Sequence, residues 1–283
     1  MNSFQSIALG VLQGVAEFLP ISSSGHLALA EKFFALNQPL IFDVFLHIAT
    51  LIVVCIFFRE TIADLFRAFF KMILRKPIDE NFSGKSELTL TDERARKTVI
   101  AIIVTTIVTG TLGIFFEKFI RDFPIQSVCI GFLITAFLLI LSWKIGERIE
   151  AVRTNENAKQ KNISLVQAIV IGVFQGIGVL PGISRSGATI AGGLLSGLSR
   201  SACGEFSFIV SIPAILGAFL LELKDLAFFS EINFLQLVLA FASSLVAGWL
   251  SLSFLMRMIK KGALVYFAFY LIPLGLCCLI LFF

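Results

Sequence analysis

The chain has 283 residues, of which 57% are hydrophobic and only 15% are Asp, Glu, Lys or Arg. Soluble domains are roughly 45–50% apolar and about 25% charged, so this chain has too few polar side chains to cover a water-exposed surface. Its net charge of +4 is modest, and it lacks a basic cluster with interleaved aromatic residues, which excludes nucleic acid as a partner.

The first apolar segment, residues 4–34, is interrupted by polar residues from Pro20 to His26. Non-helical backbone at membrane depth is tolerated only where protein or a wet cavity surrounds it, so this segment predicts a re-entrant helix–loop–helix. Residues 164–199 predict a second such hairpin, because Pro181 to Gly187 interrupt them in the same way.

Six further segments are mainly apolar over about 20 residues, the length needed to cross a bilayer. These predicted spans are 41–58, 98–116, 125–143, 203–222, 234–256 and 264–283. The predicted fold is therefore an all-α polytopic membrane protein, with residues 1–283 forming a single integral membrane domain surrounded by bilayer lipids.

The polar connections predict the orientation in the membrane. Most Lys and Arg residues lie in 59–97, 144–163 and 256–263, and an excess of cations marks the cytoplasmic side. Loop 59–97 is therefore expected in the cytoplasm, with both termini on the outer side. Within this loop, residues 62–76 alternate apolar and basic side chains, which predicts an interfacial amphipathic helix.

The two hairpins are similar in sequence. At one constant offset Gln13-Gly14 recurs as Gln175-Gly176, Ile21-Ser22 as Ile183-Ser184, and Ser24-Gly25 as Ser186-Gly187. This pattern predicts an internal duplication, with repeat 1 at about 1–145 and repeat 2 at about 163–283. An odd number of spans separates the hairpins, so the second copy is expected to enter the membrane in inverted topology, as in many transporters.

Polar side chains at membrane depth are costly and mark a functional site. The hairpins supply Gln13, Glu17, Ser22, Ser23, Ser24 and His26 from the first copy, and Gln175, Ser184, Arg185, Ser186 and Thr189 from the second. Each Ser-x-Ser-Gly precedes a helix-compatible run, so each loop is expected at a helix N-terminus, which attracts anions. The guanidinium of Arg185 adds a planar fork suited to phosphate oxygens. A phosphate-like anion is the expected ligand.

The two copies differ where chemistry would require it. Glu17, Ser23 and His26 are replaced in the second copy by Val179, Arg185 and Ala188. One loop thus holds a nucleophile with candidate bases and the other a cation, a division suited to phosphoryl transfer. His26 lies one helical turn beyond Ser23, and its ring is expected to reach the Ser23 hydroxyl.

Several of these polar residues have a second interpretation. Ser22 and Ser24 could act only as helix caps. His47 follows Asp43 by four residues on one helical face, and this pair could either support the site or form a hydrogen bond of the packed core. Both questions stay open at the level of sequence.

Two stretches carry a resemblance to a known family: Gln13-Gly14-Val15-Ala16-Glu17-Phe18-Leu19-Pro20-Ile21-Ser22-Ser23-Ser24-Gly25-His26 and Pro181-Gly182-Ile183-Ser184-Arg185-Ser186-Gly187-Ala188-Thr189. Both resemble the undecaprenyl-diphosphatase family, also called the bacitracin-resistance protein (BacA) family. The likeness extends to Phe42-Asp43-Val44 and to Glu205-Phe206-Ser207-Phe208. It therefore covers nearly the whole chain.

The resemblance implies hydrolysis of undecaprenyl diphosphate to undecaprenyl phosphate in the bacterial plasma membrane, which recycles the lipid carrier for peptidoglycan and confers bacitracin resistance. It implies an active site open to the outer side. It also implies that Ser23 is the nucleophile, that His26 and Glu17 are catalytic, and that Arg185 binds phosphate. The substrate-binding residues expected around them are Ser22, Ser24, Gly25, Ser184, Ser186, Gly187 and Thr189.

A divalent cation, Mg²⁺ or Ca²⁺, is also implied by the resemblance, with Glu17 and Gln13 at the positions of the family's paired acids. A neutral amide is a weaker ligand for such cations than a carboxylate, so one of the two expected charges is missing here. The alternative function is an inverted-repeat transporter or lipid flippase for a phosphorylated substrate. The oligomeric state stays open, with a homodimer as one alternative.

Overall fold

The structure is a computed structural model that describes residues 1–36, 40–120, 124–156, 162–222 and 233–282. These residues form eleven helices and no strand. The helices are α1 (Ser3–Phe18), α2 (Ser23–Phe33), α3 (Leu40–Phe57), α4 (Arg59–Ile73), α5 (Asp92–Ile120), α6 (Ile125–Glu156), α7 (Leu165–Ile177), α8 (Arg185–Leu195), α9 (Arg200–Glu222), α10 (Phe234–Lys261) and α11 (Val265–Phe282). The prediction of an all-α polytopic membrane protein is confirmed.

All six predicted spans are helices. Five of them, α5, α6, α9, α10 and α11, are long and apolar enough to cross a membrane by themselves. The sixth, α3, reaches that length together with α4, from which it is bent by 80°. The spans α5 and α6 extend beyond their predicted ends, because polar residues outside the apolar stretches continue the same helices.

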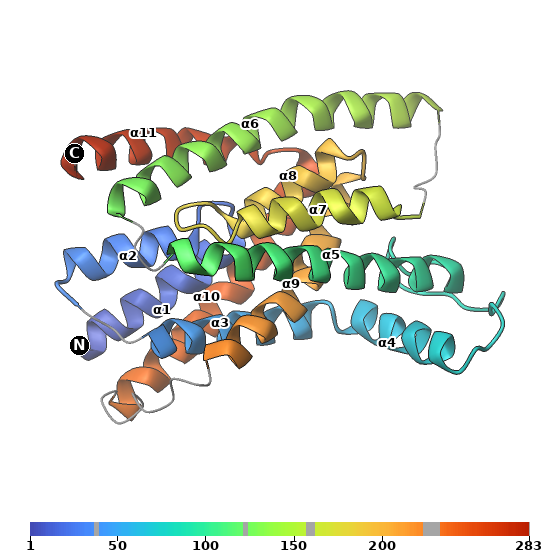
Figure 1. The fold of residues 1–283 in the computed structure, drawn as a ribbon, viewed down its shortest axis with the longest axis horizontal. Helices are drawn as coiled ribbons and strands as arrows, with labels where there is room; N and C mark the ends of the chain where they lie inside the picture. Colours follow the sequence, from blue (N-terminus) through green and yellow to red (C-terminus); the bar gives the residue numbers. More distant parts are fainter. Residues whose placement is uncertain (37–39, 121–123, 157–161, 223–232, 283) are drawn as a thin grey trace.

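The two interrupted segments are helix–loop–helix hairpins, α1–α2 and α7–α8. Both begin with a capping box, in which Asn2 and Gln5 at α1, and Ser164 and Gln167 at α7, satisfy each other's backbone N–H groups. In Figure 1 the first hairpin starts at the end of the bundle that holds both chain termini, and the second starts at the opposite end. The internal duplication itself stays a prediction.

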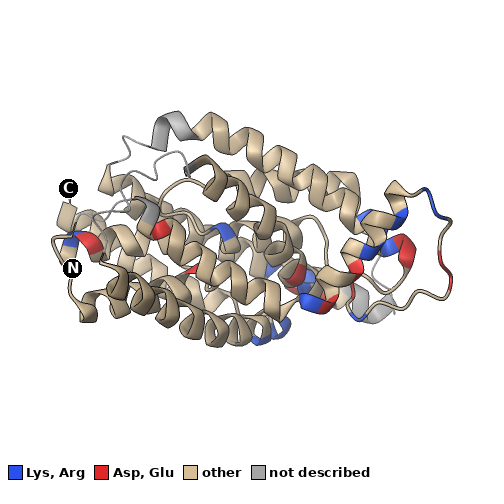
Figure 2. Ribbon diagram, turned by 90° about the horizontal axis from the view of Figure 1, so that it is seen from below, with Lys and Arg blue, Asp and Glu red and all other residues tan. Residues whose placement is uncertain are grey.

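Charged residues are concentrated at one end of the molecule. Figure 2 shows most Lys, Arg, Asp and Glu residues gathered at the end away from the two termini. Helix α4 lies there and exposes large apolar side chains, including Phe66 and Phe70, while it buries Leu65 and Ala68. The amphipathic helix expected in the polar loop is therefore present, and each of its ends lies three residues earlier than predicted.

Long helices from distant parts of the chain pack closely at glycines. Helix α1 packs along α10, and α7 packs along α5. A Cβ atom on Gly10 of α1 would clash with the backbone oxygen of Ala240 in α10, and one on Gly172 of α7 would lie 3.0 Å from the backbone oxygen of Thr105 in α5. Small residues that let two backbones approach are a common basis of helix association in membranes.

Gly10→Ala is expected to lower the thermal unfolding midpoint of the purified protein in detergent, because overpacking a close contact costs about 1–3 kcal/mol. Gly113→Ala in α5 is the matched control, since a Cβ there meets nothing within 4 Å. Alanine favours helix over glycine, so the midpoint of the control should stay or rise. Equal midpoints for both variants would show that the α1–α10 contact tolerates a methyl group.

Candidate active site

The loops of the two hairpins touch inside the bundle. Each loop ends at a cap serine, Ser22 before α2 and Ser184 before α8. A Cβ atom on Gly187, in the first turn of α8, would lie 3.1 Å from the Cβ of Pro20 in the first loop. The two helix N-termini therefore meet, as the sequence predicted for an anion site.

Helix α6 supports both loops. A Cβ on Gly25 would lie 2.6 Å from the ring of Phe132, so the start of α2 rests directly on α6. The backbone N–H of Ser184 donates to the Thr135 hydroxyl at 3.0 Å. Gly182 has φ of 86°, a conformation that favours glycine, and packs against the backbone of α6. One helix thus contacts both loops and sets the relative position of the two helix N-termini.

Helix α2 begins at Ser23 and α8 at Arg185, earlier than the sequence analysis expected for α2. Ser22 and Ser184 are the N-caps, and their hydroxyls accept the N–H groups of Gly25 and Gly187 at 3.3 and 3.1 Å. These two glycine N–H groups, expected to bind substrate, are therefore already engaged. The first two N–H groups of each helix have no intrahelical acceptor and are the ones available to an anion.

Ser22 also carries backbone strain. Its φ of 73° lies in the left-handed region, whereas its counterpart Ser184 has an ordinary φ of −75°. A non-glycine residue in this region costs about 1–3 kcal/mol and is typical of functional loops. Between the two cap serines, the strained one belongs to the hairpin that also carries Ser23 and Glu17.

Glu17, near the end of α1, is the centre of the site. Its Oε2 accepts the Ser23 hydroxyl at 2.7 Å and the Gln13 amide nitrogen at 3.1 Å. Its Oε1 forms an ion pair with the Arg185 guanidinium from the other hairpin. The carboxylate is buried, and a buried charge is tolerated only when it is paired and hydrogen-bonded. Three residues singled out by sequence, Glu17, Ser23 and Arg185, are therefore in direct contact.

His26 does not contact Ser23 as the sequence analysis expected. Its Nδ1 lies 2.8 Å from the backbone oxygen of Ser22, and its Nε2 lies 2.8 Å from the hydroxyl of Tyr270 in α11. A carbonyl oxygen can only accept, so Nδ1 donates and Nε2 of the neutral ring accepts from Tyr270. The ring therefore points toward α11, and its bond to the backbone oxygen of Ser22 spans one turn of α2.

The histidine that contacts Glu17 is His47 in α3. Its Nε2 lies 3.3 Å from Glu17 Oε2, and its Nδ1 lies 2.8 Å from the backbone oxygen of Asp43. Of the two interpretations left open for the Asp43–His47 pair, the contact with Glu17 favours support of the site. The polarity of His47 within an apolar span was the one available signal, and nothing local to α3 pointed to Glu17.

The remaining serines and Thr189 lie around this centre. The hydroxyls of Ser22 and Ser24 are 3.4 Å apart, and those of Ser184 and Ser186 are 3.1 Å apart. Thr189 donates to the backbone of its own helix, at 2.8 Å from the oxygen of Arg185. Thr189 also lines a narrow pocket beside Glu17 and Arg185.

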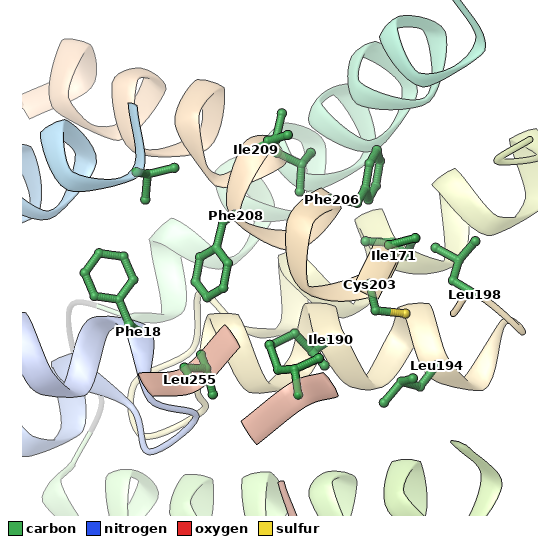
Figure 3. Close-up of a cluster of buried hydrophobic side chains, with 14 of the residues drawn as sticks. Phe18, Ile171, Ile190, Leu194, Leu198, Cys203, Phe206, Phe208, Ile209 and Leu255 are labelled. Carbon is green, nitrogen blue, oxygen red and sulfur yellow. The ribbon is translucent and has the colours of Figure 1, made fainter. Parts of the chain in front are cut away.

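This pocket lies between α1, α3, α8 and α9. Its polar lining is Glu17, Thr50, Arg185, Ser186, Thr189, Ser207 and Ser211, and its apolar lining is Phe18, Val54, Phe208 and Ile215. The apolar part continues into the buried core that Figure 3 shows, where the rings of Phe18 and Phe208 stand edge to face with centroids 5.7 Å apart. The pocket is therefore polar around Glu17 and Arg185 and apolar where it borders the core.

The side chains around Glu17 do not fit a resident divalent cation. No group of three or more Asp, Glu, His or Cys side chains within the described ranges could hold a metal ion. The single carboxylate, Glu17, is already paired with Arg185, and Gln13 turns its amide nitrogen toward it. A hard cation prefers several oxygen ligands with more than one negative charge, so no step of the reaction is assigned to a metal here.

A model of the family described as "Bacitracin resistance protein BacA" matches residues 6–277. A protein of Treponema denticola named undecaprenyl-diphosphatase is 46% identical over 278 residues, which are 98% of this chain and 96% of the relative. A protein of the same name from Borrelia recurrentis is 38% identical, covering 96% of both chains. Another from Methanobrevibacter smithii is 36% identical, covering 95% of this chain and 94% of the relative.

These matches include both hairpins and every helix that contributes to the Glu17 site. The chain therefore belongs to the bacitracin resistance protein BacA family.

Proposed function

We propose that this protein is a membrane phosphatase that hydrolyses undecaprenyl diphosphate to undecaprenyl phosphate and inorganic phosphate, and so recycles the lipid carrier of peptidoglycan synthesis and confers bacitracin resistance. The observation that carries the proposal is the Ser23 hydroxyl bonded to the Glu17 carboxylate, with the Arg185 guanidinium on the other carboxylate oxygen. A nucleophile, a base and a phosphate-binding cation thus converge. Relatives that match over nearly the whole chain carry the corresponding name.

The diphosphate would bind where the two helix N-termini meet. The first N–H groups of α2 and α8 and the Arg185 side chain supply donors for its oxygens. A guanidinium has five N–H donors, so Arg185 can bind a phosphoryl oxygen while one donor faces Glu17. The polyprenyl tail would lie among the apolar helices in the bilayer.

In the proposed reaction Glu17 accepts the Ser23 proton as Ser23 Oγ attacks the terminal phosphorus. The bond from that phosphorus to the bridging oxygen breaks, Glu17 passes the proton to that oxygen, and undecaprenyl phosphate leaves. Water then attacks the phosphoserine, which releases phosphate and restores the hydroxyl. Arg185 and the helix N–H groups stabilise the charge that develops on the phosphoryl oxygens.

The transporter alternative is not favoured by this geometry. A carrier that alternates between two sides is expected to use equivalent groups in its two repeats. Here the Glu17–Ser23 pair belongs to one hairpin and its counterparts are Val179 and Arg185. The unequal chemistry of the two hairpins supports an enzyme.

Arg185→Ala is expected to abolish phosphate release from a purified prenyl diphosphate, because the developing charge loses its cation. Arg185→Lys should recover only part of the rate, since a point charge lacks the planar fork. Phosphate release by wild-type protein tests the function itself, and its absence in a folded, monodisperse sample would contradict the proposal. A fully active Arg185→Lys variant would contradict only the bidentate binding of phosphate by Arg185 and not the proposed function.

Ser23→Ala is expected to lower kcat by several orders of magnitude while the protein stays folded, because it removes the nucleophile. Ser22→Ala is the comparison: it removes a helix cap, which costs about 1 kcal/mol of stability, and should retain more activity. Mass spectrometry of wild-type protein quenched during turnover should find phosphate on Ser23. A near wild-type rate for Ser23→Ala would assign the attack to water instead.

The proposed orientation places both termini and the site opening on the outer side and loop 59–97 in the cytoplasm. Its support is the gathering of charged residues at the end away from the termini (Figure 2) and the excess of cations on cytoplasmic faces. Cysteines introduced as Lys85→Cys and Asn2→Cys should therefore react with a membrane-impermeant thiol reagent from opposite sides. Labelling of both in intact cells would overturn the orientation.

A further inference from the structure

The chain contains two histidines, and the two contact different parts of the site. His26 is occupied by the backbone of Ser22 and by Tyr270. His47 is the histidine whose ring reaches the Glu17 carboxylate, at 3.3 Å. Although His26 is nearer to Ser23 in sequence, it is His47 that contacts Glu17, the hydrogen-bond partner of Ser23.

The orientation of the His47 ring is fixed by its own helix. Nδ1 lies 2.8 Å from the backbone oxygen of Asp43, one turn earlier in α3. That oxygen only accepts, so Nδ1 carries a hydrogen and the ring plane is set by this bond. The Glu17 carboxylate also only accepts, so Nε2 carries a hydrogen too and His47 acts as the imidazolium. Nε2 then points toward Glu17 Oε2. The bond to the Asp43 backbone thus holds the ring in the rotamer that directs Nε2–H at Glu17.

The Glu17 carboxylate is held from two sides. Arg185 of α8 binds Oε1, whereas His47 of α3 and the Gln13 amide of α1 approach Oε2. Oε2 is also the oxygen that accepts the Ser23 hydroxyl, at 2.7 Å. Without His47, only the neutral Gln13 amide and the Ser23 hydroxyl would oppose a rotation that brings both oxygens onto the guanidinium fork, which is the preferred bidentate geometry. Oε2 would then turn away from Ser23.

We propose that His47 is a positioning residue of the phosphatase reaction: it holds Oε2 of Glu17 toward the Ser23 hydroxyl against the competing fork of Arg185. The proposal rests on the proposed function, in which Glu17 receives the Ser23 proton. The ring nitrogens of His47 are directed at the Asp43 backbone and at Glu17. It acts through Glu17 alone.

The proposal is tested with two substitutions of His47 in the full-length protein. Phenylalanine keeps the ring but removes the nitrogen that faces Glu17, whereas glutamine can place an amide N–H at the same distance along the side chain. Because a misplaced catalytic group costs about 100-fold in rate, His47→Phe should lower kcat by about that factor, with KM nearly unchanged. His47→Gln should recover most of the loss.

A double-mutant cycle separates this role from ordinary packing. If His47 acts through Glu17, then Glu17→Gln combined with His47→Phe should be no slower than Glu17→Gln alone, because residues that act as a unit are not additive. Tyr270→Phe is the matched control, since it removes the hydrogen bond of the other histidine. Its effect should add to that of Glu17→Gln.

The outcomes distinguish the role of His47 from the proposed function itself. A His47→Phe variant with the wild-type kcat overturns the proposal, and so does a loss that adds fully to that of Glu17→Gln. A loss that appears in KM, or that glutamine does not rescue, also counts against it. Absence of phosphate release by wild-type protein would instead contradict the proposed function. Thermal unfolding midpoints of all variants, measured on the same samples, identify any that fail to fold.

Discussion

The ion pair between Glu17 and Arg185 is the interaction on which the site depends, because it joins the two hairpins inside the helix bundle. Each partner alone would be an uncompensated charge at membrane depth, which is costly enough to be rare. Removing either one leaves the other without its charged counterpart in the opposite hairpin, and this is more damaging than removing both. The pair therefore fixes the relative position of the hairpins and also supplies the base and the cation of the proposed reaction.

Close packing of the two loops against α6 brings Glu17 and Arg185 near enough to form this ion pair. Helix α6 carries both loops, with Gly131 so near Gly182 that a Cβ atom would lie 2.5 Å from the Gly182 backbone. The loops could not reach one another if larger residues separated α6 from them. The strained φ of Ser22 belongs to the same arrangement, because it turns the chain so that α2 starts at Ser23 and the hydroxyl faces Glu17. The same loop conformation therefore sets both the packing against α6 and the contact of Ser23 with Glu17.

Sequence patterns predicted the hairpins, the spans and three of the central residues, since polar side chains in apolar segments and unequal positions between the two copies are visible without coordinates. The contacts of the two histidines could not be predicted. A one-turn spacing suggested that His26 serves Ser23, but the start of α2 and the distant Tyr270 decide where that ring points. His47 meets Glu17 only because α3 packs against α1, and no local pattern carries that information.

The order in which the chain is synthesised gives the ion pair a further consequence. Arg185 follows Glu17 by 168 residues, and Tyr270 follows His26 by 244. When the first hairpin leaves the ribosome, the cation that neutralises its carboxylate has not been made, so full burial of Glu17 is unfavourable at that stage. We therefore expect the first hairpin to reach its final depth only after the second has entered the membrane. The hydrogen bond between His26 and Tyr270 forms only when α11 has been inserted. Assembly of this site is therefore a late event in the biogenesis of the protein, and a chain truncated before α11 would insert helices without completing the site.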